Sequence, residues 1–286
     1  MNHSSKKRLV IQKIGFGSMA VVAGLTIALI ILVVLYIVFM GAEAISFEFI
    51  FQAPYDGMRS GGVFPAIIGT IYLTIGTAAL SVPLGLGAAI YLSEYAPDNQ
   101  MTRLVRIAIT NLAGIPSVVY GLFGLGLFVL FLGFGTSIIA ASMTLAIMTL
   151  PVIISTAEEA LRAVPQSFRV VSISLGGTRW QTIRKIVLPE ALPGILTGVI
   201  LGLERAAGET APIMFTGAAF FLPRLPTALT DATMALPYHL FVISTQVPGM
   251  PVQIQFGTAL VLLIFVLGMN LIASIIRSRA RAKRQW

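Results

Sequence analysis

The chain has 286 residues, of which 57% are hydrophobic and 10% are charged, and its mean hydropathy is +0.92. A soluble domain of this length could not bury so much apolar surface in one core, so the composition excludes a soluble globular protein. The net charge of +8 would suit a nucleic-acid-binding protein, but most of the 19 Lys and Arg residues flank the apolar runs, where they set membrane topology. We expect no nucleic-acid partner.

Six apolar runs are long enough to cross a hydrocarbon layer about 30 Å thick. They are predicted to be helices, because unpaired backbone groups are intolerable in lipid and the runs are too long for barrel strands. The first run follows a basic tail over 1–16 and exceeds the apolar part of a cleaved signal peptide, so we expect it to remain as a span. The predicted spans are 17–40, 65–92, 107–132, 136–156, 191–215 and 256–276.

Basic residues gather in the segments that join these spans on one side of the membrane. These segments are the tail 1–16, the loops 93–106 and 157–190, and the tail 277–286. The positive-inside rule therefore places both termini in the cytoplasm, with 41–64 and 216–255 as external loops. The sequence predicts an all-α integral membrane protein in contact with membrane lipid, whose five later spans form one core over 65–276.

The sequence offers no residues for catalysis. It lacks a G-x-x-x-x-G-K-S/T stretch that would bind nucleotide phosphates, and it has no cysteine. Its two histidines, His3 and His239, are far apart in sequence, which argues against a metal site or a catalytic triad. We therefore expect no enzymatic activity, no metal and no cofactor in this chain, and any energy must come from a partner.

The loop 157–190 contains a pattern typical of a short helix that follows a turn. Gly176 and Gly177 are predicted to form a tight bend, because glycine tolerates backbone conformations that other residues avoid. Thr178 is predicted to be the N-cap of a compact helix over 179–183.

The side chains of this predicted helix suit an interface. Arg179 and Trp180, followed by Gln181, supply the residue types that anchor protein–protein contacts, so we expect the helix to dock on a cytoplasmic partner. The alternative is a helix at the membrane surface, with Trp180 in the aromatic belt. Pro189 and Pro193 are predicted to mark the start of the next span.

The fifth predicted span carries charge inside an apolar run. Gly194, Gly198 and Gly202 recur every four residues, which lets another helix approach closely. Arg205 and Glu209 are also four apart and so share one helix face. Because each charge costs roughly 2.5–3.5 kcal/mol in a span, their presence calls for a reason. In the first interpretation, which we favour, Arg205 attracts a crossing anion, and Glu209 orients it or gates access. In the second, the pair neutralises itself or binds a sister subunit as a helix–helix contact.

Several segments resemble known transport proteins. Gly176 is followed, after nine residues, by Ile186-Val187-Leu188-Pro189, and this spacing resembles the cytoplasmic signature loop of ABC importer permeases. The likeness narrows to the PstA-type permease of the phosphate-specific importer through PSVVYGLF (116–123), GGTRWQTIRKIVL (176–188), GETAP (208–212) and ALPYHLFVISTQ (235–246). The chain departs from that family at Val170-Val171-Ser172, where Glu-Ala-Ser or Glu-Ala-Ala is usual.

This resemblance implies a type I ABC importer permease with six transmembrane helices, located in the cytoplasmic (inner) membrane and importing inorganic phosphate. It implies three partners, namely a PstC-like sister permease, a cytoplasmic ATPase dimer that binds ATP and Mg, and an external phosphate-binding protein. The segment 176–181 would couple to the ATPase, and Arg205, Glu209 and Thr210 would line the substrate pathway. The alternatives are a permease for sulfate, molybdate or a phosphonate, an ATP-independent channel or carrier, or a non-transporting scaffold.

Overall fold

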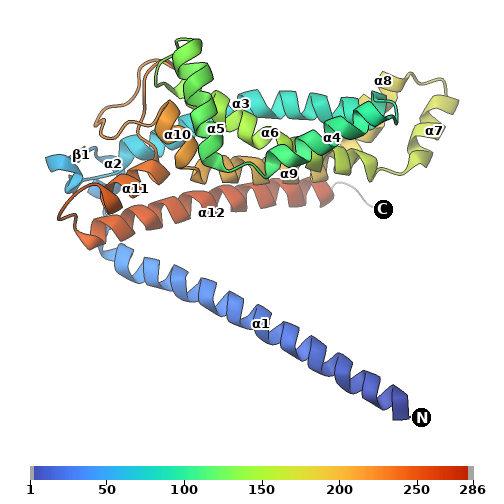
Figure 1. Cartoon of the computed structure of the whole chain (residues 1–286), viewed down its shortest axis with the longest axis horizontal. Helices are drawn as coiled ribbons and strands as arrows, with labels where there is room; N and C mark the ends of the chain where they lie inside the picture. The colour runs from blue at the N-terminus through green and yellow to red at the C-terminus, as the bar shows by residue number, and fades with distance from the viewer. Residues whose placement is uncertain (1–2, 283–286) are drawn as a thin grey trace.

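The computed structural model describes residues 3–282 and consists mainly of helices. Figure 1 shows an elongated bundle from which α1 (His3–Gly41) leans away. Residues 1–2 and 283–286, the outermost parts of the two predicted basic tails, lie outside the described residues. The long helices of the bundle are α3 (Phe64–Ile90), α6 (Ile138–Arg162), α9 (Leu188–Gly208) and α12 (Val252–Ala282).

The central helix of the bundle is α6, which packs along both α3 and α9. Its buried side chains Leu145 and Met148 share a cluster with Tyr120 and Ile213. A second cluster, nearer the opposite end of α6, joins its residues to the start of α9 and consists of Ala89, Ala157, Leu161, Val164, Val187, Ala191 and Ile195. The position of α9, which carries the predicted pathway residues, is therefore set by its contact with α6.

Among the described residues, five helical segments are continuous, long and apolar enough to cross a membrane. The third predicted span is different. It consists of α4 (Gln100–Ala113) and α5 (Ser117–Gly124, continued as the π-helical η4, Leu125–Phe131), which are bent by 99°. The prediction of a single helix over 107–132 is therefore wrong, and the count of six spans holds when the bent pair is taken as one.

The bend between α4 and α5 follows from one proline. Pro116 has no backbone N–H, and its ring would clash with the carbonyl of Leu112 in a continuous helix. The hydroxyl of Tyr120 donates to that carbonyl at 2.7 Å, and the N–H of Ile115 donates to it at 3.1 Å. The break is thus stabilised by groups that lie on both sides of it.

The fifth predicted span is also interrupted, so the prediction of one helix over 191–215 is wrong. α9 ends at Gly208, and a separate short helix, α10, covers Ala211–Thr216. Pro212 lies four residues after Gly208, so its ring would meet the Gly208 carbonyl if the helix continued. Glu209 and Thr210 consequently lie at a break in the helix.

One end of the bundle carries short elements where an irregular connection was predicted for 41–64. They are η1 (Ala42–Ala44), α2 (Phe47–Phe51), β1 (Pro54–Tyr55), η2 (Asp56–Met58) and β2 (Ser60–Gly61). The two strands are antiparallel, with Pro54 paired with Gly61 and Tyr55 with Ser60. α11 (Leu236–Thr245), from the second predicted external loop, lies at the same end and packs on α12.

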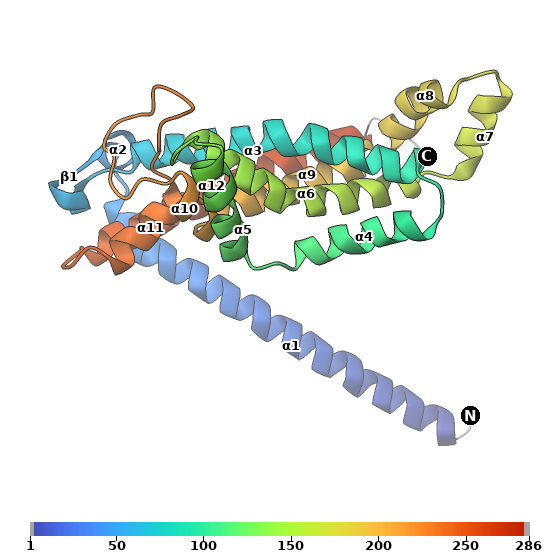
Figure 2. The same cartoon turned by 45° about the horizontal axis from the view of Figure 1, so that its top comes forward.

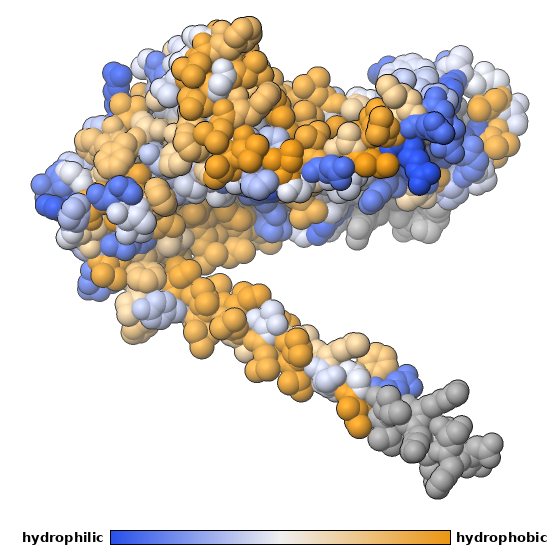
Figure 3. Space-filling model, viewed as in Figure 1, coloured by the Kyte–Doolittle hydropathy of each residue, from blue (hydrophilic) through white to orange (hydrophobic). Residues whose placement is uncertain are grey.

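The other end carries α7 (Gln166–Ser174), α8 (Arg179–Thr182) and the π-helical η5 (Ile183–Val187). Figures 1 and 2 place the described ends of α1 and α12 at this same end. Hydrophobic surface covers α1 and the middle of the bundle, and hydrophilic surface lies at both ends (Figure 3). This agrees with a topology that puts both termini and the loop 157–190 on one side of the membrane. The assignment of this side to the cytoplasm stays a prediction.

Candidate functional site

The glycine stripe of α9 faces α6, as the sequence predicts. A Cβ at Gly194 would lie 2.6 Å from the Cβ of Ala160, and one at Gly202 would lie 3.2 Å from Ile153. A Cβ at Gly198 would overlap the hydroxyl of Thr156. The backbone of α9 therefore packs directly against side chains of α6 along this stripe, up to the last two turns of α9.

Arg205 and Glu209 form an ion pair at the end of α9. The Arg205 Nε donates to the Glu209 Oε1 at 3.2 Å. Glu209 follows the last helical residue with an extended backbone, and its side chain is only 17% exposed, whereas that of Arg205 is 37% exposed. A guanidinium carries five N–H donors, and this one makes a single hydrogen bond among the described residues. The pair is formed, yet most of the donor capacity of Arg205 remains.

Thr210 lies between the two helices. Its carbonyl accepts the N–H of Met214 at 3.1 Å and so starts α10. The small cavity beside Glu209 also touches Thr70, Thr74 and Pro237, and its volume is about 10 Å³. Because a water molecule needs about that space, this cavity is closed to any larger solute. The structure therefore groups Arg205, Glu209 and Thr210 at one helix break, and the cavity beside Glu209 has room for no more than a water molecule.

Glu204 points away from this break. Its Oε2 accepts a hydrogen bond from the Asn270 Nδ2 of α12 at 3.1 Å. Glu204 and Arg205 thus lie on different faces of α9, because consecutive helical positions are about 100° apart. Only Arg205 faces the break.

The predicted turn and cap in the loop 157–190 are present. Gly176 has a φ of +83°, a conformation that glycine adopts without strain. The Thr178 hydroxyl accepts the N–H of Gln181 at 3.2 Å, and the Gln181 side chain accepts the N–H of Thr178 at 2.9 Å. These reciprocal hydrogen bonds form a capping box, which fixes where α8 begins.

The helix that starts at Thr178 does not stop near residue 183, and this corrects the prediction of a separate compact helix. α8 continues through η5 into α9, so 179–208 is one helical segment. A π turn widens the helix just before Pro189 and Pro193, and such local adjustments accommodate residues that lack an N–H. The start of α8 and the last turn of α9, which carries Arg205, therefore belong to the same helical segment.

The surface formed by α7 and α8 exposes several apolar side chains among polar ones. α7 has no buried residue, and Leu175 and Trp180 are 83% and 54% exposed. A groove of about 510 Å³ runs beside them and is lined by Phe168, Val171, Gln181 and Ile186, among others. Val170 and Val171, which replace the usual Glu-Ala of the resembling family, are also exposed. Apolar patches outside the spans mark interaction sites.

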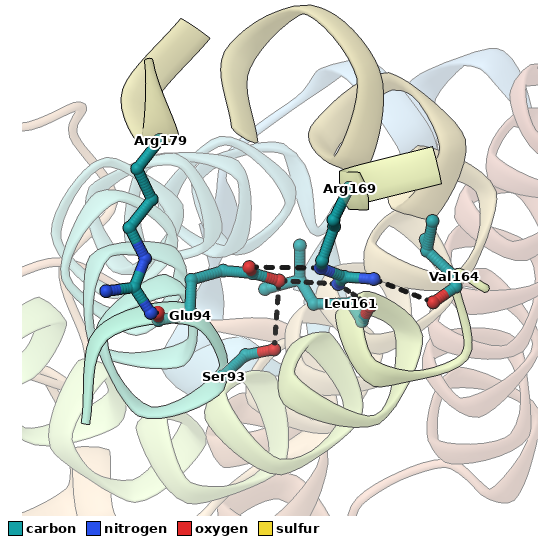
Figure 4. A network of polar contacts seen from close by, with 6 residues as sticks. All are labelled: Ser93, Glu94, Leu161, Val164, Arg169 and Arg179. Carbon is teal, nitrogen blue, oxygen red and sulfur yellow. Dashed lines mark hydrogen bonds and ion pairs between the residues drawn. The ribbon is translucent and has the colours of Figure 1, made fainter. Parts of the chain in front are cut away.

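A polar network next to this surface was missed by sequence reasoning. Arg169 donates to both carboxylate oxygens of Glu94, at 2.6 and 3.2 Å, and to the carbonyls of Val164 and Leu161, at 2.8 and 2.9 Å (Figure 4). The side chains of Arg169 and Glu94 are only 12% and 7% exposed. They are 75 residues apart in sequence, so no local pattern could have paired them.

The sequence of this chain matches one protein family. Residues 81–283 match the family model described as binding-protein-dependent transport system inner membrane component. The probable ABC transporter permease protein YqgI of Bacillus subtilis is 32% identical over 280 residues, which cover 93% of this chain and 95% of that protein. The phosphate transport system permease protein PstA 1 of Mycobacterium tuberculosis is 37% identical over 227 residues, which cover 79% and 73%.

Solved structures give the same fold at low sequence identity. An inward-facing MetNI methionine ABC transporter matches with a TM-score of 0.61 and 20% identity, covering 75% of this chain and 94% of that one. A bacterial ABC transporter involved in alginate import matches with a TM-score of 0.60 and 16% identity, covering 82% and 84%. The type I ABC importer permease fold predicted from the sequence is confirmed.

Proposed function

The chain belongs to the family of inner membrane components of binding-protein-dependent transport systems, and on this basis we propose that it is the permease subunit of an ATP-driven importer of inorganic phosphate. It is a multi-pass protein of the inner membrane. The similarity to phosphate transport permeases of the PstA type supports the choice of substrate, and the positive charge of Arg205 suits an anion.

The observation that carries this proposal is the unused donor capacity of Arg205. An anion that leaves water for a low-dielectric passage loses hydration, and a positive charge with free N–H donors offsets part of that cost. Glu209 holds the guanidinium at the helix break through one hydrogen bond and leaves the other donors open. Arg205 thus attracts phosphate, Glu209 positions the Arg205 guanidinium, and Thr210 lines the same break.

Energy for transport enters at the opposite end of the segment 179–208. We assign the exposed surface of α7 and α8 to a cytoplasmic ATPase dimer, which binds the ATP and Mg that this chain does not bind. Gly176 and the capping box at Thr178 hold the start of α8 in place, so that movement of the ATPase is passed along one continuous helix. A PstC-like sister permease would complete the passage, and an external phosphate-binding protein would deliver the substrate.

The proposal is tested by reconstituting the chain with its sister permease, ATPase and binding protein in liposomes. We expect uptake of radiolabelled phosphate that requires ATP and the binding protein. Excess sulfate, molybdate or phosphonate should not compete, and competition by one of them would reassign the substrate. Uptake by the purified chain alone, without ATP, would contradict the proposal and favour a channel or carrier.

A further inference from the structure

The last turn of the α3 segment, the π-helical η3 (Tyr91–Tyr95), receives arginine side chains from three other elements. Arg106 of α4 donates to the carbonyl of Leu92 at 2.8 Å. Arg169 of α7 binds the Glu94 carboxylate, and Arg179 of α8 donates to the Glu94 carbonyl. The final carbonyls of a helix lack partners within the helix and carry partial negative charge, so cations are favoured there.

The contact between α7 and η3 is geometrically demanding. The fork of Arg169 matches both oxygens of Glu94, and its remaining N–H groups reach two carbonyls at the end of α6 and just beyond it. Arg179 adds a second contact, because its guanidinium also lies 5.0 Å from the centre of the Tyr95 ring. Figure 4 shows both arginines approaching Glu94 from different elements.

Apolar packing supplies only part of this connection, because Phe168 of α7 packs at the edge of the buried cluster that includes Ala89 of α3. α7 buries no residue, and a cavity of about 470 Å³ lies beside the network, lined by Ser93, Arg162 and Gln166, among others. Phe168 is an apolar contact between α7 and this cluster, and the Arg169–Glu94 pair adds a directed polar contact with the α3 segment. The loop is thus joined covalently to α6 before α7 and to α9 through η5, and Glu94 attaches it to α3 as well.

We propose that Glu94, Arg169 and Arg179 form a hub that makes the cytoplasmic end of α3 move together with α7 and α8 during transport. This inference rests on the proposed function. Glu94 and Arg169 are positioning residues in it, since neither lies at the helix break that carries Arg205. Arg106 extends the hub to α4, because its Nε also binds Glu158 of α6 at 2.8 Å. Without the hub, movement of the ATPase would still displace α9, but α3 would no longer move with it.

The first test measures the ratio of phosphate uptake to ATP hydrolysis in the complete complex in liposomes. Glu94→Gln should retain hydrolysis while the ratio falls at least about fivefold, the lower end of typical coupling between sites. Adding Arg169→Glu to Glu94→Arg should recover part of the ratio lost in each single variant. Arg103→Gln is the matched control, because Arg103 is exposed and its side chain makes no hydrogen bond or ion pair within the described residues.

A second readout does not depend on substrate. The chain has no cysteine, so spin labels at Tyr91→Cys on η3 and Ser174→Cys on α7 report one distance. We expect ATP to leave that distance unchanged with Glu94 present and to change it in the Glu94→Gln background. An unchanged distance in both backgrounds, or an unchanged uptake ratio in Glu94→Gln, would overturn the hub. Failure of the wild-type complex to take up phosphate would instead count against the proposed function, and the label distance would still decide on the hub.

Discussion

Two arginines of this chain each pair with a glutamate, and they differ in how many of their donors are used. Arg169, near the loop that we assign to the ATPase, binds both oxygens of Glu94 and two backbone carbonyls. Arg205, at the break after α9, makes one hydrogen bond to Glu209 among the residues described. Their side chains are 12% and 37% exposed.

This difference in satisfied donors indicates that Arg169 has a structural role, whereas Arg205 can still bind a ligand. A buried guanidinium with its donors satisfied is locked in place, and it holds together the elements that supply the acceptors. A partly exposed guanidinium with donors to spare keeps its charge available for an anion. Substitutions at Arg205 and at the contacts that hold the helices around it should differ widely in the size of their effects.

The largest effect is expected at Arg205. Replacing it by Gln removes the charge while keeping a polar side chain of similar length, and phosphate uptake should fall at least about 30-fold. Initial rates of uptake in the reconstituted complex measure this, with equal insertion checked on the same membranes. Arg59→Gln, at the hairpin end of the bundle, serves as the control for loss of one positive charge. Wild-type uptake by Arg205→Gln would remove Arg205 from the pathway.

Gly198→Ala tests how much the close contact between α9 and α6 contributes to stability. The added Cβ would overlap the Thr156 hydroxyl, so we expect a loss of about 1–3 kcal/mol in stability from overpacking. Thermal unfolding in detergent measures the effect. Gly87→Ala in α3 is the control, because a Cβ there meets nothing within 4 Å in the described structure. Equal midpoints for the two variants would show that the stripe is not needed.

Tyr120→Phe extends the comparison to the other broken helix. The Tyr120 hydroxyl satisfies the Leu112 carbonyl at the bend caused by Pro116, and its removal should cost about 1 kcal/mol of stability. The same unfolding assay applies, with Tyr72→Phe as a control because Tyr72 is exposed. If the two variants unfold alike, the bend does not depend on this hydrogen bond.

The smallest effect is expected at Asp231, in the loop between α10 and α11. The N–H of Thr227, with that of Ala228 and the Thr227 hydroxyl, donates to its carboxylate and lowers the pKa of Asp231. A lowered pKa stabilises the folded loop above the ordinary value near 4, and this contribution is lost as pH falls through the lowered pKa. Pepsin cleavage of the loop should therefore rise below about pH 4 more in the wild type than in Asp231→Asn. Parallel pH dependence would contradict this.

Local sequence patterns were enough to predict much of the fold. Apolar length located the spans, the four-residue glycine spacing indicated a face of close helix contact, and Thr178 marked the start of α8. Each of these features depends on residues close in sequence. The short elements over 42–61 were missed, because segments of two to five residues carry little periodicity.

The two helix breaks could not be decided from sequence because proline has more than one outcome in this chain. Pro116 and Pro212 follow breaks, whereas Pro83, Pro151 and Pro193 lie inside continuous helices. Neighbouring helices and local π turns determine which outcome occurs. The pairing of Glu94 with Arg169 was hidden for another reason, since it depends on tertiary contact alone.

The most direct test of the contrast between the two arginines is to replace each by lysine and measure uptake and hydrolysis together. Lysine keeps the charge but loses the planar fork. Arg205→Lys should therefore keep a substantial part of phosphate uptake, because charge is what the anion needs there. Arg169→Lys should keep hydrolysis but lose uptake per ATP, because its geometry holds α7 to α3. Equal loss in both variants, or the reverse order, would contradict the account.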